Sequence, residues 1–212
     1  MNAEQLLESM RPEIDRHISG NEFVARVRAG EIDHAQVQRL VIAEFYCQEA
    51  ELPTYGLLVG RHRHEAPANL FGLTIHTVAK ARRVLGPVAE AVGLRPDDLS
   101  VAAGGRLSRD LSLPGLLAEP GEAALYLHSD LSVWCPVFSE LVEAAQQVDS
   151  VPKELIEYMA WWGSEPPQDI TDGVLEVLTY ALGQGEDPDR ILDFARQLES
   201  GVSTYWDYVL TG

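Results

Sequence analysis

The sequence predicts an all-α protein, a bundle of about seven or eight helices in a single domain that spans residues 1–212. Most segments carry apolar residues at steps of three and four, which is the period of an amphipathic helix, and the alternation typical of strands is almost absent. A hydrophobic content of 46% over 212 residues is enough for one sizeable core, and no repeat or long linker divides the chain. Helices packed around one core are therefore the expected architecture.

Capping and turn residues indicate where the helices begin and end. The N-terminal stretch MNAEQLLESMRPEIDRH is charged and helical, and a three-four apolar pattern runs from Ala35 to Arg61. The stretches 96–105 and 146–154 are rich in turn and capping residues, so they are expected connectors. The expected N-caps are Asp97 or Asp98, Ser150 and Asp187, and the expected helix ends are Gly93, Gly105 and Gly183–Gly185.

The composition of the chain indicates in which cellular compartment the protein is expected and which classes of partner are disfavoured. No apolar run approaches the roughly 18 residues that span a bilayer, and the charged N-terminus is unlike a signal peptide, so a soluble, cytoplasmic protein is expected. A formal charge of −17 and a pI near 4.6 disfavour nucleic acid and anionic membranes as partners. Cys47 and Cys135 stand alone, without the spacing of a zinc site, and are expected to be reduced thiols.

Two carboxylates lie seven residues apart in the segment EFYCQEAEL. On a helix Glu44, Gln48 and Glu51 fall within about 60° of one another, on an arc that also carries apolar residues. A buried carboxylate costs several kcal/mol unless it is paired, hydrogen-bonded or protonated. The arc therefore predicts a polar pocket or a metal site, and the alternative is a structural salt bridge to an arginine.

Several motifs, taken in order, resemble the TenA (thiaminase II) and PqqC-like proteins of the haem-oxygenase-like fold. The segment NEFVARVRAGEIDHAQVQRLVIAEFYCQEAELP looks like the opening helix pair of that family, with Glu44 and Phe45 as its acidic-aromatic pair. SDLSVWCPVFSELVEAA is similar to the helix that carries a reactive cysteine, and TYWDYV to the ending of the last helix. YMAWWGSEP resembles a further stretch of the family, with Trp162 in the place of a tyrosine.

The chain also departs from the family pattern. With Phe138 aligned to the aromatic of the family, Trp134 stands at the position of the nucleophilic cysteine, and Cys135 follows one residue later, about 100° further round the helix. Val202 replaces the late glutamate, and Glu199 lies one turn earlier. Thiaminase II chemistry requires a nucleophile and acidic partners. These departures predict a diverged reaction, in which Cys135 is dispensable.

The resemblance implies a central pocket and a cofactor-free enzyme that acts on a small heterocyclic or amine-bearing metabolite. Glu44 and Glu51 are the expected catalytic residues, because a carboxylate can accept a hydrogen bond from a ring NH or an amine. Aromatic side chains nearby would suit a flat ring. The expected substrate-binding residues are Gln48, Cys47, Trp134, Cys135, Phe138, Trp162, Glu199 and Tyr205.

Two other functions stay open. One is a non-haem iron oxidase, a class that the same fold hosts. His76 could then join Glu44 and Glu51 as a ligand, but it also fits a hydrogen-bonded core histidine, and the late helix has no histidine, so no metal is expected. The other is a non-catalytic small-molecule-binding protein. In each case the resemblance implies a homodimer or a homotetramer.

Overall fold

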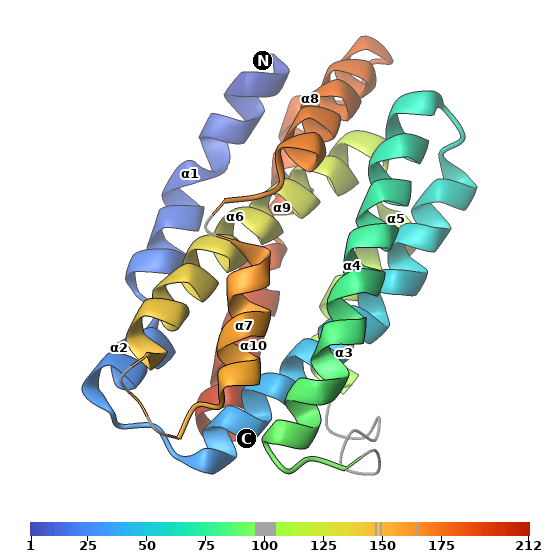
Figure 1. The fold of residues 1–212 in the computed structure, drawn as a ribbon. Coiled ribbons are helices and arrows are strands. Elements are labelled where there is room, and N and C mark those ends of the chain that lie inside the picture. Colours follow the sequence, from blue (N-terminus) through green and yellow to red (C-terminus); the bar gives the residue numbers. More distant parts are fainter. Residues whose placement is uncertain (96–104, 147, 149, 164) are drawn as a thin grey trace.

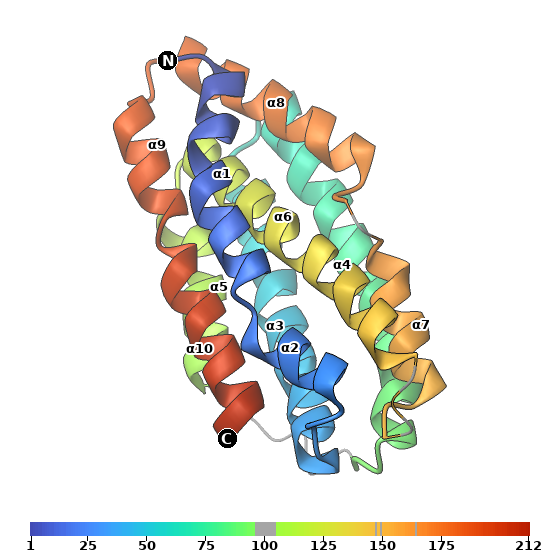
Figure 2. The same ribbon diagram turned by 90° about the vertical axis from the view of Figure 1, so that its left-hand side faces the viewer.

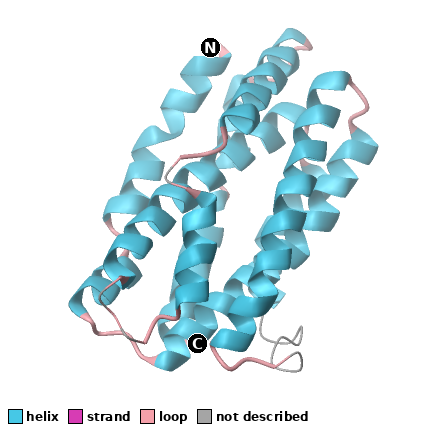
Figure 3. Ribbon diagram, in the orientation of Figure 1, coloured by secondary structure: helices cyan, strands magenta, loops and turns pink. Residues whose placement is uncertain are grey.

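A computed structural model describes residues 1–95, 105–146, 148, 150–163 and 165–212, with the backbone alone for 105–110. In these ranges the chain is helical and has no strand, which confirms the all-α prediction (Figure 3). Eight of the described helices have ten residues or more, and α2 and α9 are short helices of eight residues. The helices are α1 (Ala3–Ser19), α2 (Glu22–Ala29), α3 (His34–Arg61), α4 (Glu65–Ala91), α5 (Gly105–Leu117), α6 (Pro120–Ala145), α7 (Lys153–Trp162), α8 (Gln168–Gly183), α9 (Pro188–Ala195) and α10 (Leu198–Thr211).

Two of the boundary predictions are wrong, each for a local reason. Ser150 does not cap α7, whose N-cap is Pro152. The residue before a proline is pushed out of the helical region, so no helix can start at Val151. Gly105 begins α5 instead of ending a helix, since glycine is tolerated at either end.

Other boundaries agree with the sequence. Asp187 caps α9 and accepts a hydrogen bond from the backbone of Asp189 at 3.1 Å. Gly93 follows α4 and Gly185 follows α8, each with the positive φ that suits a glycine after a helix. Asp97 and Asp98 lie outside the described residues.

Helix α6 is the central element of the bundle. It is buried over most of its length and packs against α1, α2, α7, α8 and α9 (Figures 1 and 2). Helices α3 and α4 pair along one side, and α3 also packs against α5 and α10. None of the helices in the described ranges combines the length and the apolarity that a membrane span requires.

A close approach between α5 and α3 holds one wall of the bundle in place. Gly115 of α5 lies against Thr54 of α3, and a Cβ atom at Gly115 would stand 2.9 Å from the Thr54 Cα and 3.0 Å from its carbonyl oxygen. The Thr54 hydroxyl in turn donates to the Leu111 carbonyl at 3.0 Å. Both contacts depend on a small residue at position 115.

We expect Gly115→Ala to lower the free energy of unfolding by about 1–3 kcal/mol, because the methyl group would push two helix backbones apart. The control is Gly56→Ala on α3, where no atom lies within 4 Å of the new Cβ. That change should be neutral or stabilise the helix by up to about 1 kcal/mol. Urea unfolding measures both variants, and an equal response would contradict the close packing.

Candidate functional site

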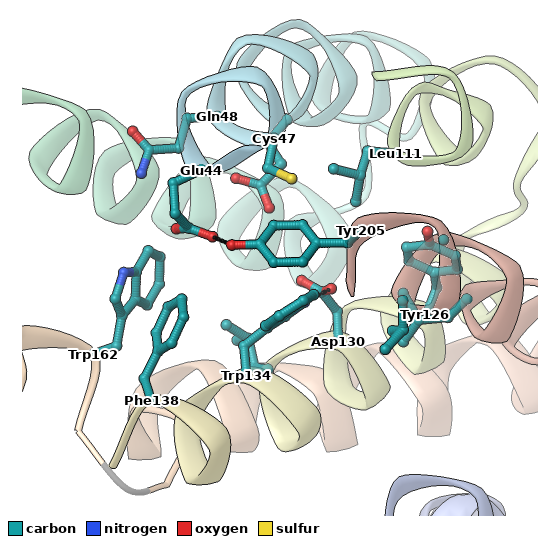
Figure 4. A pocket seen from close by; sticks show the side chains of 15 residues that line it. Glu44, Cys47, Gln48, Leu111, Tyr126, Asp130, Trp134, Phe138, Trp162 and Tyr205 are labelled. Atoms are coloured by element: carbon teal, nitrogen blue, oxygen red, sulfur yellow. Dashed lines mark hydrogen bonds between the residues drawn. The ribbon is translucent and has the colours of Figure 1, made fainter. Parts of the chain in front are cut away.

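A cavity lies inside the bundle between α3, α6 and α10, with further walls from α5 and α7 (Figure 4). About 50 Å³ of it is open to the centres of water-sized molecules, several times the roughly 10–15 Å³ that one water requires. The lining residues that the structure describes are Glu44, Cys47, Gln48, Glu51, Leu111, Tyr126, Asp130, Leu131, Trp134, Phe138, Trp162, Leu198, Gly201, Val202 and Tyr205.

Glu44 of α3 lines this cavity and is only 7% exposed. The Tyr205 hydroxyl donates to its Oε1 at 2.7 Å (Figure 4), and the Tyr158 hydroxyl donates to its Oε2 at 2.5 Å. The Gln48 amide nitrogen supports this arrangement from one turn away by donating to the Tyr158 oxygen at 2.6 Å. The carboxylate is therefore fixed through both of its oxygens.

Two opposing effects set the charge of Glu44. Burial raises its pKa above the usual value, and the hydrogen bonds from Tyr158 and Tyr205 lower it in part. A carboxylate held in this way can accept a hydrogen bond from an N–H group of a ligand.

Asp130 and Glu51 form a second acidic part of the cavity. Asp130 reaches in from α6, is 4% exposed, and accepts a hydrogen bond from the Trp134 indole at 2.7 Å. Burial, together with the charge of Glu44, raises the pKa of Asp130 to about 7, although the Trp134 hydrogen bond lowers it. Burial, then the charges of Asp130 and Glu44, hold the pKa of Glu51 well above its usual range.

Aromatic side chains form the walls on the α6 side. The Trp134 ring lies between Phe138 and Tyr205, with ring centroids 5.9 Å and 4.5 Å away. Trp162, at the end of α7, lines the same cavity beside Phe138 (Figure 4). Flat rings and cationic groups both bind well against such surfaces.

The helical arc predicted from sequence is confirmed as geometry, since Glu44, Gln48 and Glu51 all line one cavity. Of the other predicted substrate-binding residues, the same cavity brings together Cys47, Trp134, Phe138, Trp162 and Tyr205.

Glu199, an expected substrate-binding residue, and His76, named as a ligand only in the iron-oxidase alternative, both lie away from the cavity. Glu199 is partly exposed on α10 and pairs with Arg16 at 3.2 Å. The face of α10 that lines the cavity carries Val202 and Tyr205, and Glu199 is rotated away from it. His76 is exposed on α4, so it is neither a ligand beside Glu44 nor a core histidine.

Asp130 and Tyr158 are among the residues of the site that were missed in the sequence. Asp130 stands four residues before Trp134, and Tyr158 stands four residues before Trp162. Residues four apart share one helix face, so each polar residue could have been found from its aromatic neighbour.

The comparisons with known proteins bear on the fold. No protein-family model matches the chain, and no curated protein matches it. A solved TenA homologue from Pyrococcus furiosus superposes with a TM-score of 0.76 at 14% identity, covering 99% of this chain and 100% of its own. This chain has a TenA-like fold. A solved TenA family transcription regulator from a Silicibacter species superposes with a TM-score of 0.75 at 14% identity, covering 100% of this chain and 97% of its own.

A more distant likeness names the wider fold. A domain with a heme oxygenase-like fold from Shewanella denitrificans gives a TM-score of 0.61 at 11% identity, covering 98% of this chain and 93% of its own. The expectation of a TenA-like, haem-oxygenase-like bundle is therefore confirmed. At these identities the likeness concerns the fold alone.

The side chains that could ligate a metal in this TenA-like fold bear on the iron-oxidase alternative. Among the described residues, no group of three or more His, Cys, Asp or Glu side chains is arranged to hold a metal ion. The described lining of the cavity includes no histidine. Metal independence stays a prediction, which metal analysis of the purified protein tests.

The two thiols occupy different places in the TenA-like fold. Cys135 is fully buried and is absent from the described lining of the cavity, so the structure does not bring it together with the other predicted substrate-binding residues. Its position one residue after Trp134 turns the thiol into the core. Burial, and then the charge of Asp130, raises the pKa of Cys135 to about 12. Cys47 does line the cavity, but burial and the charges of Glu44, Glu51 and Asp130 hold its pKa well above the usual range.

We expect the intact protein to show no appreciable hydrolysis of an aminopyrimidine by the thiaminase II route, because neither thiol is a thiolate at neutral pH. Cys135→Ala should leave ligand binding unchanged and lower the free energy of unfolding by about 1 kcal/mol. Cys47→Ala, which enlarges the cavity, is the matched variant and should alter ligand affinity. Aminopyrimidine turnover that Cys135→Ala abolishes without loss of fold would contradict this account.

Proposed function

We propose that this chain is a cofactor-free enzyme of the TenA/PqqC-like kind that acts on a small heterocyclic or amine-bearing metabolite, by chemistry diverged from thiaminase II. The supporting observation is Glu44, a buried carboxylate fixed through both oxygens by Tyr158 and Tyr205. It faces a cavity walled by aromatic rings. Such a carboxylate binds a ring NH or an amine while the rings stack on a flat ligand.

Proton transfer is the chemistry that these side chains support. Asp130 has a pKa of about 7, so it can both donate and accept a proton at neutral pH. Glu44 would hold the substrate nitrogen, and Asp130 or Glu51 would exchange the proton at the reacting atom. The aromatic walls keep bulk water away from this exchange.

Matched pairs of ligands test the proposal. Each pair consists of an amino-substituted heterocycle and its methyl analogue, such as 2-aminopyrimidine and 2-methylpyrimidine. We expect the amino member to raise the melting temperature of the protein more than its methyl analogue, because only the amino group can donate to Glu44. Equal shifts across the pairs would contradict the proposal.

A non-catalytic binding protein is the second candidate, and the state of the thiols favours it. Neither Cys47 nor Cys135 is a ready nucleophile. Prolonged incubation with the amines that bind, followed by mass spectrometry, separates the two candidates. A product that Glu44→Gln abolishes supports the enzyme, and unchanged ligands support the binding protein.

We also propose a homodimer or homotetramer, in keeping with the family resemblance, and a cytoplasmic location. Exposed Leu57, Leu116 and Leu117 offer apolar surface on α3 and α5 for self-association. Light scattering at micromolar concentration should give a multiple of the 23.4 kDa chain mass. A mass equal to one chain would contradict the proposed assembly.

A further inference from the structure

The acidic groups of the cavity outnumber what a single amine can neutralise. Glu44, Glu51 and Asp130 all line it, and no Lys, Arg or His side chain does so among the described residues. We propose that the ligand is a linear diamine or polyamine, with one amine bound by Glu44 and a second bound by Glu51 and Asp130. This inference rests on the proposed function, because it specifies which amines the same cavity takes.

The spacing of the carboxylates sets the length of the ligand. Glu44 and Glu51 are seven residues apart on α3, so they share one face and their Cα atoms lie about 10.5 Å apart along the helix axis. A charge-assisted hydrogen bond of about 2.8 Å at each end takes up part of this span, which leaves about 5–10 Å between the two nitrogens. A short alkyl chain between two amines has this length.

A second, independent feature also indicates a ligand rich in N–H groups. Gln48 lines the cavity and is 1% exposed, and its Oε1 has no hydrogen-bond partner in the described part of the chain. Its Nε2 is already used by Tyr158, so the orphaned atom is an acceptor. A buried acceptor without a donor costs about 1–3 kcal/mol, and an ammonium group beside Glu44 would satisfy it.

The surface between the two acidic ends suits an alkyl chain. Tyr205 donates a hydrogen bond to Glu44 and Trp134 donates one to Asp130, and the rings of these two aromatic residues are 4.5 Å apart at the centroids. Aromatic faces pack against methylene groups and attract the cationic ends. A ring-only ligand would fill the part of the cavity near Phe138 and leave the Asp130 end without a cation.

The charge balance of the site agrees with a dication. Burial and the neighbouring carboxylates raise the pKa of Glu51, and burial with the charge of Glu44 raises that of Asp130. Like charges this close in a buried site are unfavourable unless cations neutralise them. A ligand with two ammonium groups would allow these carboxylates to ionise in place.

Calorimetric titration with 1,5-diaminopentane and n-pentylamine tests the inference. The two amines share one alkyl chain and differ in the second amine. We expect the diamine to bind at least about tenfold more tightly, because its second ammonium gains a buried charged partner. Spermidine, which is longer and carries three amines, should bind at least as tightly as the diamine.

Substitutions on α3 test whether Glu51 binds the second ammonium group of the diamine. Glu51→Gln should bring the affinity for the diamine down to that of the wild-type protein for n-pentylamine, whereas exposed Glu49→Gln on the same helix should leave the affinity for the diamine unchanged. Equal affinities of the two amines for the wild-type protein would overturn the inference, and so would a diamine affinity that Glu51→Gln leaves intact. If amino-heterocycles still bind through Glu44 in that case, the proposed function stands and only the dication is wrong.

Discussion

Glu44→Gln should weaken the binding of an amine-bearing ligand by about 30-fold or more, which makes it the substitution with the largest expected effect on function. Removing one partner of a buried, hydrogen-bonded charge pair costs about 2–5 kcal/mol, and 2 kcal/mol corresponds to about 30-fold. Glutamine has the same size as glutamate, and its amide oxygen can still accept a hydrogen bond from Tyr158 or Tyr205. The fold should therefore persist while the charge is lost.

The matched control for this variant lies on the same helix. Glu49 is exposed on α3 and pairs with Arg82 of α4, outside the described lining of the cavity. Glu49→Gln removes the same charge from the chain without touching the site. Titration of both variants with an amino-heterocycle measures the difference, and equal affinities would exclude Glu44 as the recognition group.

Asp130→Asn should stabilise the protein at pH 8 on the order of 1–4 kcal/mol, the largest expected effect on stability. The pKa of Asp130 rises on folding from its ordinary 3.8 to about 7, mainly through burial. Between these values the folded state holds more protons than the unfolded state, so its stability falls as the pH rises from about 4 to about 7. Asparagine has no such dependence and can still accept from Trp134.

The pH dependence of this stability gain distinguishes an effect of the Asp130 charge from a change in packing. The advantage of Asp130→Asn should be full at pH 8 and should be largely lost near pH 4, where the aspartic acid is protonated in the folded state and about half protonated in the unfolded state. Denaturant unfolding at several pH values measures it, with exposed Asp207→Asn on α10 as the control. A gain in stability that persists unchanged at pH 4 would show that folding does not raise the pKa of Asp130.

An acid that destabilises the fold without a ligand is typical of a functional site. The charges of Glu44 and Glu51 both act on Asp130, and among the described residues the Trp134 indole alone offsets its burial with a hydrogen bond. A residue selected for stability alone would be apolar here. The cost of Asp130 therefore agrees with a role in ligand binding or proton transfer.

The set of α3 residues that face the cavity could be predicted, because it depends only on the spacing of residues along one helix. The arc of Glu44, Gln48 and Glu51 follows from the pitch of one helix, and the structure places all three at one cavity. The expected position of Glu199 at the cavity depends on more than the spacing within one helix. Which face of α10 turns inward depends on its packing against α3 and α5, and spacing within one helix does not contain that information.

The hydrogen-bond network around Glu44 is tertiary and could not be predicted in the same way. Tyr158 and Tyr205 come from helices more than 100 residues away along the chain, at separations of 114 and 161 residues. No pattern in a single sequence pairs either tyrosine with Glu44. Cys135 differs, because its one-residue offset from the reactive-cysteine position can be seen in the sequence once Phe138 is aligned, and the structure places its side chain in the core.

The most direct test of the central claim is a crystal structure of the protein with a bound amine that raises its melting temperature. We expect a ligand nitrogen within about 2.7–3.2 Å of a Glu44 carboxylate oxygen, with the rest of the ligand against Trp134. An amine bound outside the cavity, or one inside it with its nitrogen turned away from Glu44, would contradict the account.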